Sequence, residues 1–409
     1  MFFNIFTSNS VNIVRATNID IFEMRKIKVL FINDMLIPDL DGATRTMFQL
    51  INRIPTDKFD FLFLCGKGPE KIRDFKCIHV PTIKIPGNNS YSIATPINKF
   101  ELDAQVEEFS PDIVHISSPT FIGNYGIKTA KRLNIPIISI YHTHYISYTD
   151  YYFKDFSIIA DITKNTAKIK TKEFYEQCDI VYIPSMMIIN ELAEIGIRKE
   201  KLKLWQRGID HNIFSPSKKD PELLHSITGN YNPCILFASR LVWEKNLQCL
   251  IDLFALIKEK QLPYNLIVAG EGTAKEQIQG QLAGAYFLGH VDHKKLAALY
   301  ASAQVFFFPS ITETFGNVVL EAMASGIPCV IADEGGSSEF IQQGENGYLC
   351  QATNANEFLS RISEIIEHPE LVQKFSEQGV KTSEKYIWEN LATEYFREIE
   401  SLSIKNHVV

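Results

Sequence analysis

The segment Ser310–Val330, SITETFGNVVLEAMASGIPCV, decides the fold of this chain. It follows Phe306–Pro309, which is typical of the end of a buried strand. Gly316 supplies a tight turn, and Val318–Ala324 has helical spacing with good helix formers. We therefore expect a helix to begin near Asn317. Its free backbone N–H groups and the positive end of its dipole would hold an anion such as a diphosphate.

Two glutamates flank this turn, with seven residues between them. Glu313 precedes the turn and Glu321 lies inside the expected helix, so both carboxylates can accept hydrogen bonds from hydroxyl groups. One suits a sugar and the other a ribose, which indicates a nucleotide-sugar site. The donor-binding residues predicted in this segment are Thr314, Phe315, Gly316, Asn317, Val318 and Glu321.

Four stretches together carry a resemblance to a known family. They are TETFGNVVLEAMASGIP after Ile311, ASRLVWEKNL at Ala238–Leu247, QRGIDHNIFSP at Gln206–Pro216 and YHTHY at Tyr141–Tyr145. This combination resembles the retaining glycosyltransferases of family four. The resemblance extends over roughly residues 25 to 400 and is more specific in the C-terminal half. It implies a GT-B fold, a nucleotide diphosphate sugar as donor, and no cofactor or metal.

The length of 409 residues favours two domains, because one hydrophobic core rarely serves so long a chain. Short strand-like runs alternate with helical stretches in both halves, which is typical of parallel α/β sheets. With the resemblance, the predicted fold class is α/β GT-B: two Rossmann-like domains facing a central cleft, with a C-terminal helix crossing back to the N-terminal domain. The predicted limits are 1–24 for an extension, 25–208 for the acceptor domain, 209–385 for the donor domain and 386–409 for the returning helix.

The predicted strands are Ile27–Ile32, Phe59–Cys65, Ile113–Ile116, Pro136–Tyr141 and Ile180–Ile183 in the first half, and Cys234–Ala238, Leu266–Ala269, Tyr286–Leu288, Val305–Phe308 and Cys329–Ala332 in the second.

Two cations follow the strand Cys234–Ala238. Arg240 and Lys245 would lie at its carboxyl edge, where Arg can bind a diphosphate through two hydrogen bonds and Lys as a point charge. There they would stabilise a leaving diphosphate in place of a metal. The alternative is a solvated pair of surface charges.

Glycine turns follow two further strands of the second half. Gly270 and Gly272 resemble the family's glycine turn, with Glu and Thr in place of Asp and Pro. His290 and Val291 correspond to the segment whose backbone holds the nucleobase in that family. The alternative for both is a strand-to-helix turn that needs glycine for its own geometry.

The N-terminal half contributes two site candidates. His142 aligns with the family's histidine beside the scissile bond and the β-phosphate, whereas His144 is an acceptor-side or structural residue. Gly42 stands where the family has two adjacent glycines, ahead of a helical run at 43–51 whose N-terminus would face the cleft. The predicted catalytic set is therefore His142, Arg240, Lys245 and Glu313.

No metal is expected. Asp39 and Asp41 form an Asp-x-Asp, but three-residue matches are common by chance and the two cations already serve the phosphates. The seven cysteines are odd in number and include no Cys-x-x-Cys pair, so buried thiols in a reducing compartment fit best. A net charge of −7 argues against nucleic acid as a partner.

The sequence predicts a cytoplasmic protein. Its first 23 residues lack a signal-peptide pattern, and no apolar stretch is long enough to span a bilayer. Lysines interleave with apolar residues at Tyr151–Tyr175, which suggests a basic surface for peripheral contact with anionic lipid at the inner face of the membrane. An ordinary helix with a solvated lysine face is the alternative.

These observations predict a retaining, metal-independent hexosyltransferase that moves a sugar from a UDP- or GDP-sugar to an acceptor hydroxyl. The motif combination is similar to members acting on lipids or glycolipids. Three alternatives stay open: a soluble or polysaccharide-precursor acceptor, a sugar phosphorylase on the same fold, and a nucleotide-sugar-binding protein without catalysis. A dinucleotide fingerprint, a P-loop and a nucleophile elbow are absent from the sequence.

Overall fold

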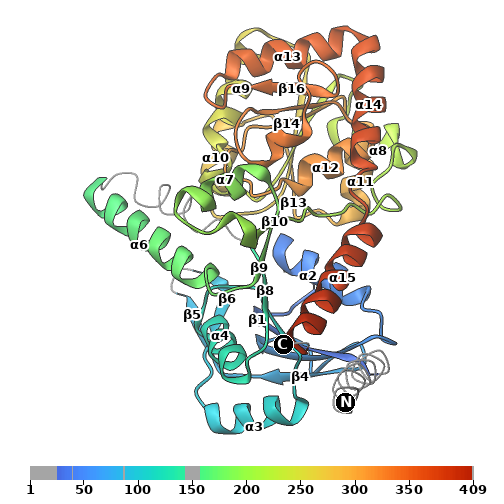
Figure 1. Ribbon diagram of the computed structural model, residues 1–409. Helices are drawn as coiled ribbons and strands as arrows, with labels where there is room; N and C mark the ends of the chain where they lie inside the picture. The colour runs from blue at the N-terminus through green and yellow to red at the C-terminus, as the bar shows by residue number, and fades with distance from the viewer. Residues whose placement is uncertain (1–24, 39, 86–87, 143–156, 408–409) are drawn as a thin grey trace, which may run out of the picture.

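The computed structural model describes residues 25–38, 40–85, 88–142 and 157–407. They form two α/β halves, each built on its own sheet (Figure 1). The strands of the first sheet lie between Ile27 and Leu204, and those of the second between Cys234 and Cys350. The predicted boundary at 208/209 falls between the two sheets, while the domain limits themselves stay a prediction.

The first sheet has eight strands in the order β10-β9-β8-β7-β1-β2-β4-β3, and all its pairs are parallel except β3 with β4. A separate antiparallel ribbon pairs β5 with β6. The bounds are β1 Ile27–Met35, β2 Phe59–Lys67, β3 Lys71–Ile72, β4 Phe75–His79, β5 Thr82–Ile85, β6 Asn88–Ala94, β7 Ile113–Ile116, β8 Ile137–Ile140, β9 Ile180–Ile183 and β10 Leu202–Leu204. The helices of this half are α2 Gly42–Asn52, α3 Lys99–Phe109, α4 Phe121–Leu133, α6 Ser157–Tyr175, α7 Met186–Glu194 and the short η1 Lys199–Lys201.

The second sheet has six parallel strands in the order β13-β12-β11-β14-β15-β16. Their bounds are β11 Cys234–Ala238, β12 Asn265–Ala269, β13 Tyr286–Gly289, β14 Val305–Phe308, β15 Cys329–Ala332 and β16 Gly347–Cys350. The helices are α8 Pro221–Thr228, α9 Leu247–Glu259, α10 Lys275–Gln281, α11 His293–Ser302, α12 Asn317–Ala324, α13 Ala355–Glu367, α14 Pro369–Ser383 and α15 Trp388–His407, with short turns η2 Pro216–Lys218, η3 Trp243–Lys245 and η4 Gly336–Phe340.

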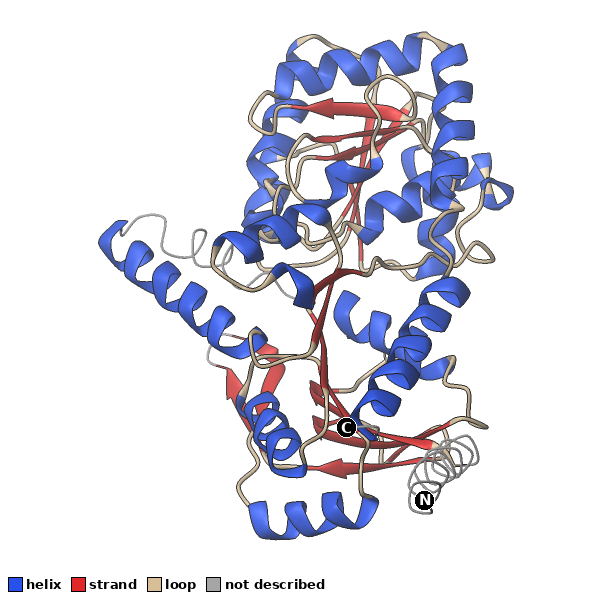
Figure 2. Cartoon of the chain, viewed as in Figure 1, coloured by secondary structure: helices blue, strands red, loops and turns tan. Residues whose placement is uncertain are grey.

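Both sheets are buried on both faces. Leu30 and Ile32 of β1 lie in one apolar core, whereas Val29 and Phe31 lie in another. Because successive side chains of a strand point to opposite faces, these are the two sides of one sheet. Figure 2 shows helices flanking the strands in each half. This arrangement explains why the parallel strands are continuous apolar runs rather than alternating ones.

Helix α15 belongs in sequence to the second half but packs on the first. Figure 1 shows it running down from the C-terminal half to lie beside α2. Its Trp388 ring lies 6.2 Å from that of Trp205, whose Nε1 donates a 3.0 Å hydrogen bond to the Leu391 carbonyl. Tyr395 shares a 2.7 Å hydrogen bond with His115 of β7. The prediction of a returning C-terminal helix is therefore confirmed.

Each sheet has a point where the strand order reverses. In the first sheet β1 lies between β7 and β2, and in the second β11 lies between β12 and β14. Loops leaving such neighbouring strands diverge to opposite faces, so a crevice forms at their carboxyl ends. The loops after β11 and β14 hold the predicted Arg240, Lys245 and Glu313.

The predicted strands all exist, with ends that differ by at most two residues except in β1, which continues three residues further to Met35. The pattern missed β3, β4, β5, β6, β10 and β16, which are short or lie at a sheet edge. Within the described part of the chain, every helix is too short or too polar to cross a membrane.

Candidate functional site

The turn before α12 requires glycine. Gly316 has φ of +92°, and a Cβ there would lie 2.4 Å from the Cβ of Ser337. Helix α12 begins at Asn317, as predicted, and its first turn holds no acidic residue that would compete for an anion. The Oδ1 atom of Asn317 and the Oγ atom of Ser337 have no hydrogen-bond partner among the described residues. The helix start thus presents backbone amides and unpaired side-chain groups together.

Lys245 and Glu313 form the centre of the site. The Nζ atom of Lys245 lies 2.5 Å from Oε1 of Glu313, and Ser310 Oγ donates to the same oxygen at 3.0 Å. Burial raises the pKa of Glu313, but the charge and hydrogen bond of Lys245 lower it more, so the net shift is downward. An ionised Glu313 therefore holds Lys245, which keeps two further N–H donors for a ligand.

Arg240 is the more exposed of the two cations. Its guanidinium lies 3.8 Å from the buried carboxylate of Glu244, and its charge also helps to lower the pKa of Glu313. Glu244 in turn accepts a hydrogen bond at its backbone carbonyl from Thr312, which ties the loop after β11 to the loop after β14. The alternative of two freely solvated surface charges does not describe Lys245, which is 8% exposed.

Glu321 is buried in the second turn of α12. Burial raises its pKa to about 7, and Arg45 of α2 lowers it in part from 3.9 Å away. Arg45 also contacts the His293 ring at 2.6 Å. The predicted ribose acceptor therefore lies where a side chain from the first half reaches the second.

The glycine turns bring the remaining donor candidates close together. A Cβ on Gly270 would lie 1.8 Å from the Ser239 carbonyl oxygen, and one on Gly272 would lie 2.2 Å from that of Leu241. These glycines thus let the loop that carries Arg240 pack against them. Gly270 also donates a 2.8 Å backbone hydrogen bond to Gly289, next to His290 and Val291. Close backbone packing therefore requires glycine at both positions. The same packing positions the loop that carries Arg240, the cation predicted to bind phosphate.

Two predicted donor residues can contribute only through their backbone. Phe315 is 1% exposed and packs edge-on against Phe340 at 4.8 Å, so its side chain belongs to the core. Val318 packs against the same core. Thr314 is half-buried on the loop between Glu313 and Gly316.

His142 lies at the end of β8 and is buried. Neither of its ring nitrogens has a hydrogen-bond partner among the described residues. Burial, then the charges of Arg207 and His115, hold its pKa well below the usual value, so the ring is neutral near pH 7. His144 and Asp39 lie outside the described residues, as do residues 151–156 of the predicted basic surface.

Gly42 lies at the junction of the two halves. A Cβ there would be 3.5 Å from Nη1 of Arg207 and 3.6 Å from Nδ2 of Asn317. The preceding Asp41 accepts a 2.8 Å hydrogen bond from the Thr44 amide and caps α2. Capping gives Asp41 a structural task, and the single glycine brings the start of α2 next to the start of α12.

Two family models match the chain. The model described as "Glycosyltransferase Family 4" matches residues 40–213, and the one described as "Glycosyl transferases group 1" matches residues 226–382. The chain is a family-four-like glycosyltransferase with the GT-B fold.

Relatives and solved structures agree with this glycosyltransferase assignment. A GDP-mannose-dependent alpha-mannosyltransferase of Corynebacterium glutamicum is 28% identical over 93% of this chain and 91% of its own. An alpha-monoglucosyldiacylglycerol synthase of Streptococcus pneumoniae is also 28% identical, over 74% and 70%. Sucrose-phosphate synthase from Thermosynechococcus elongatus has the same fold, with a TM-score of 0.76, 19% identity and coverage of 92% and 99%. The crystal structure of Anabaena HepE in complex with UDP and glucose has a TM-score of 0.70, 20% identity and coverage of 92% and 100%.

Sequence reasoning missed two side chains that the structure places beside the candidate site residues of this glycosyltransferase. Arg207 is buried, and the carboxylates of Asp41 and Glu313 act on it while burial lowers its pKa to about 10. Arg207 belongs to the stretch QRGID quoted above. A cation directly before a glycine in that stretch could have indicated a site residue. Ser337 follows the adjacent glycines Gly335 and Gly336, and Gly336 donates a 2.7 Å hydrogen bond to the Glu313 carbonyl.

Proposed function

We propose that this glycosyltransferase moves a sugar from a nucleotide diphosphate sugar to an acceptor hydroxyl with retention of configuration and without a metal. The observation that carries the proposal is the largely buried Lys245–Glu313 pair, with side chains 10% and 18% exposed, at the reversal point of the second sheet. Beside it lie the N-terminus of α12 and the cation Arg240. Together they offer cationic charge for a diphosphate and a carboxylate for a sugar hydroxyl.

The chemistry assigns one task to each group. The bond between the sugar's anomeric carbon and the phosphate oxygen breaks, and a bond to the acceptor oxygen forms on the same face of the sugar. Lys245 and Arg240 stabilise the negative charge that develops on the diphosphate, and the amides at Gly316–Val318 bind it further. The departing phosphate oxygen takes the acceptor's proton, so no protein base is required.

Glu313, Glu321 and His142 orient the donor. An ionised Glu313 accepts hydrogen bonds from the sugar, and Glu321 accepts from the ribose. The neutral imidazole of His142, with both ring nitrogens unpaired among the described residues, suits hydrogen bonding beside the sugar and the β-phosphate. His290 and Val291, after β13, would present backbone groups to the base, next to Gly270 and Gly272.

A lipid or glycolipid is the proposed acceptor, with the protein peripheral at the cytoplasmic face of the membrane. Support comes from the relatives whose names include alpha-monoglucosyldiacylglycerol synthase and "Sulfoquinovosyl transferase SQD2" of Arabidopsis thaliana. On the described part of α6, the exposed Ile169 stands between Lys168 and Lys170, a pattern suited to an anionic lipid surface. Lys170 also pairs with Glu173, which reduces that positive charge.

A labelled-donor assay tests the proposal. Purified enzyme is incubated with UDP- and GDP-sugars, with lipid or soluble acceptors, and with or without EDTA. We expect transfer into the lipid fraction without added metal, and a product of unchanged anomeric configuration by NMR. Transfer to soluble acceptors alone would remove the lipid acceptor, and an inverted product would remove the retaining mechanism. A requirement for inorganic phosphate would identify a phosphorylase, and donor binding without turnover would identify a binding protein.

The variant Lys245→Ala tests the site itself. We expect turnover to fall about 100- to 1,000-fold, as when one charge-stabilising donor is removed from a transition state. Lys260→Ala is the matched control, because Lys260 is exposed at the end of α9. Near-normal turnover in a folded Lys245→Ala protein would overturn the assignment.

A further inference from the structure

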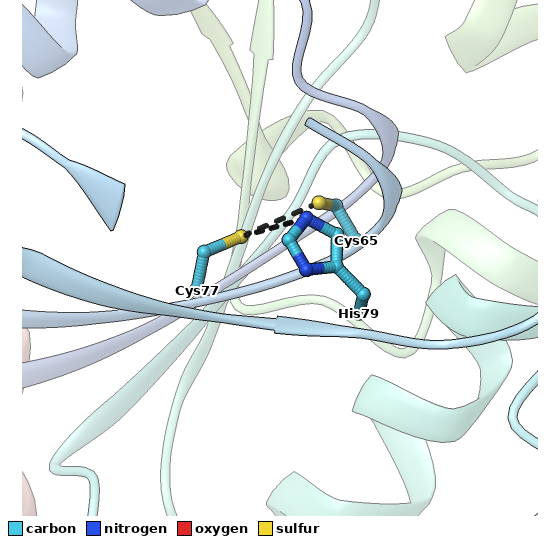
Figure 3. A group of neighbouring side chains, drawn as sticks. All are labelled: Cys65, Cys77 and His79. Atoms are coloured by element: carbon cyan, nitrogen blue, oxygen red, sulfur yellow. Dashed lines mark hydrogen bonds between the residues drawn. The ribbon is translucent and has the colours of Figure 1, made fainter. Parts of the chain in front are cut away.

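Three metal-ligating side chains meet on strands β2 and β4 of the first sheet, whereas the Lys245–Glu313 pair belongs to the second half. Cys65 ends the buried part of β2, and Cys77 and His79 belong to the neighbouring strand β4 (Figure 3). In the parallel register Phe63 faces Cys77 and Cys65 faces His79. All three therefore lie on one face of the sheet, because they are separated by even steps along their strands. Both thiols are buried, and His79 is exposed.

The distances fit a tetrahedral metal site. The sulfur atoms lie 3.4 Å apart, and the Cys77 sulfur lies 3.9 Å from Nε2 of His79. All the ligand atoms lie within 4.8 Å of one another. Bond lengths of about 2.3 Å for zinc to sulfur and about 2.0 Å for zinc to nitrogen place sulfur atoms about 3.8 Å apart and sulfur and nitrogen about 3.5 Å apart. Small side-chain rotations reach these values.

A disulfide fits this geometry less well than a bridging cation. Because Cys65 is two residues beyond the partner of Cys77, their Cα atoms are about 8 Å apart by ordinary strand spacing. Disulfides need Cα atoms closer than about 7 Å. A bond between the sulfurs would therefore require the two strands to move, whereas a cation spans the gap with the strands in place.

A pocket lies beside His79. This pocket of about 650 Å³ is lined by His79 and by residues 66–70, at the end of β2 and in the loop after it, together with Ile37 and Pro38. The Gly68 carbonyl lies 3.1 Å from Nε2 of His79, and Glu70 lines the pocket without belonging to the three-residue ligand group. Water, an oxygen of this loop or an exogenous ligand can thus complete four-coordination.

We propose that Cys65, Cys77 and His79 bind a thiophilic divalent cation, zinc in the first place. Thiolate and imidazole ligands select such a metal over magnesium or calcium. On binding, the two thiols lose their protons to solvent. The Nε2 atom of His79 binds the cation in place of its contact with the Gly68 carbonyl; it gives up the proton of that contact to solvent while Nδ1 takes one, so the ring stays neutral. The site is separate from the proposed transfer reaction, which needs no metal.

Binding at this site would hold in place residues 66–70, which form the end of β2 and the loop after it. The end of β2 is already tied to the end of β1, since Leu36 donates a 2.7 Å hydrogen bond to the Lys67 carbonyl. The chain from Leu36 leads directly to Gly42 and α2. The cation would thus support the segment that approaches Arg207 and Asn317, which makes its role one of positioning.

Cobalt binding to the full-length protein tests the site. With Co²⁺ added to reduced, metal-free protein, we expect one ion per chain and a thiolate-to-cobalt absorption band, displaced by Zn²⁺. His79→Ala is the cleanest variant, because His79 is exposed. We expect it to weaken Co²⁺ binding by at least the roughly 10- to 100-fold that loss of a supporting group around a metal costs. His368→Ala, an exposed histidine of the second half, is the matched control.

Three results would overturn the proposal: no band in the wild-type protein, an undiminished band in His79→Ala, or equal weakening in His368→Ala. A Cys65–Cys77 disulfide found by mass spectrometry in the protein as purified from cells, with no metal bound after reduction, would identify a redox pair instead. Protection of Cys77 from alkylation by Zn²⁺ in the wild-type protein tests the thiol ligands without a variant: we expect slower alkylation with Zn²⁺, and an unchanged rate would count against the site. A chelator effect on transfer that disappears in His79→Ala would belong to this site rather than to the reaction.

Discussion

At Glu321, burial favours the neutral carboxyl group, whereas the proposed role favours the ionised carboxylate. Its carboxylate is buried in α12, and among the described residues only Arg45, at 3.9 Å, provides an opposite charge. The effect of burial is larger than that of the Arg45 charge, so the pKa of Glu321 rises from 4.5 to about 7. The ionised form accepts through both oxygens and so suits the proposed contact with the ribose hydroxyls best, and keeping that form buried costs stability near neutral pH.

Glu321→Gln tests this balance. Below pH 4.5 the carboxyl is protonated in both states; between pH 4.5 and 7 only the folded state keeps the proton. The contribution of Glu321 to the free energy of unfolding therefore falls by about 1.4 kcal/mol per pH unit between pH 4.5 and pH 7, and it stays constant above pH 7. Glutamine stays neutral at every pH and escapes this loss. We therefore expect the melting temperature of Glu321→Gln minus that of the wild-type protein to increase from pH 5 to pH 7, as measured by calorimetry.

The control for this experiment is Glu334→Gln, an exposed glutamate in the loop after β15. We expect its melting temperature to follow that of the wild-type protein at every pH. A difference in melting temperature between Glu321→Gln and the wild-type protein that stays constant from pH 5 to pH 7 would contradict the raised pKa of Glu321.

Helix α15 shows how one element can bind two halves together. It places aromatic side chains into the core formed by β1, β2 and α2, although it follows the second sheet in sequence. Within that core Tyr395 bonds to His115, whose pKa falls to about 3 because of burial. The neutral histidine therefore depends on this helix for a hydrogen bond.

Tyr395→Phe removes that hydrogen bond while keeping the ring. A buried imidazole left without a partner costs about 1–3 kcal/mol, so the melting temperature should fall by several degrees. Tyr231→Phe is the control, since Tyr231 is 77% exposed. Equal melting temperatures for the two variants would show that the His115 contact adds no stability.

At the scale of the whole molecule, few polar side-chain contacts outside α15 join the halves among the residues that the structure describes. Arg45 of α2 reaches His293 and Glu321, and Glu339 accepts hydrogen bonds from the backbone amides of Met186 and Met187 at the start of α7. The contacts of Arg45 lie at the proposed ribose site, because Glu321 is the proposed ribose acceptor. Donor binding in the second half should therefore be felt in α2.

Hydrogen exchange with bound nucleotide measures this coupling. With UDP or GDP, whichever binds, we expect slower exchange in α2, because the nucleotide restrains Glu321 and with it Arg45. In Arg45→Ala the slowing should be lost while nucleotide still binds. Arg53→Ala, at the C-terminal cap of the same helix but paired with Glu389, is the control. Undiminished slowing in Arg45→Ala would mean that the halves are coupled by another route.

Much of the fold and part of the candidate site were predictable from local sequence. The parallel strands are continuous apolar runs, and the positive φ of Gly316 follows from a glycine between a strand and a helix. The prediction of a helix starting at Asn317 with glutamates on either side of the turn rests on spacing within a few residues. Strand β3 was missed because two residues form no pattern, and β16 was missed because this edge strand begins with Gly347, a residue disfavoured in strands.

The sequence by itself determined the local elements, the family resemblance and the residue types offered for catalysis. Only the tertiary structure decided that Arg207 is buried beside Gly42, that Arg45 meets Glu321, and that Cys65 lies next to Cys77 and His79. These contacts join residues on different elements, and sheet register or the packing of one half on the other creates them. Hydrophobic spacing records which face of an element is buried, but not which distant element covers it.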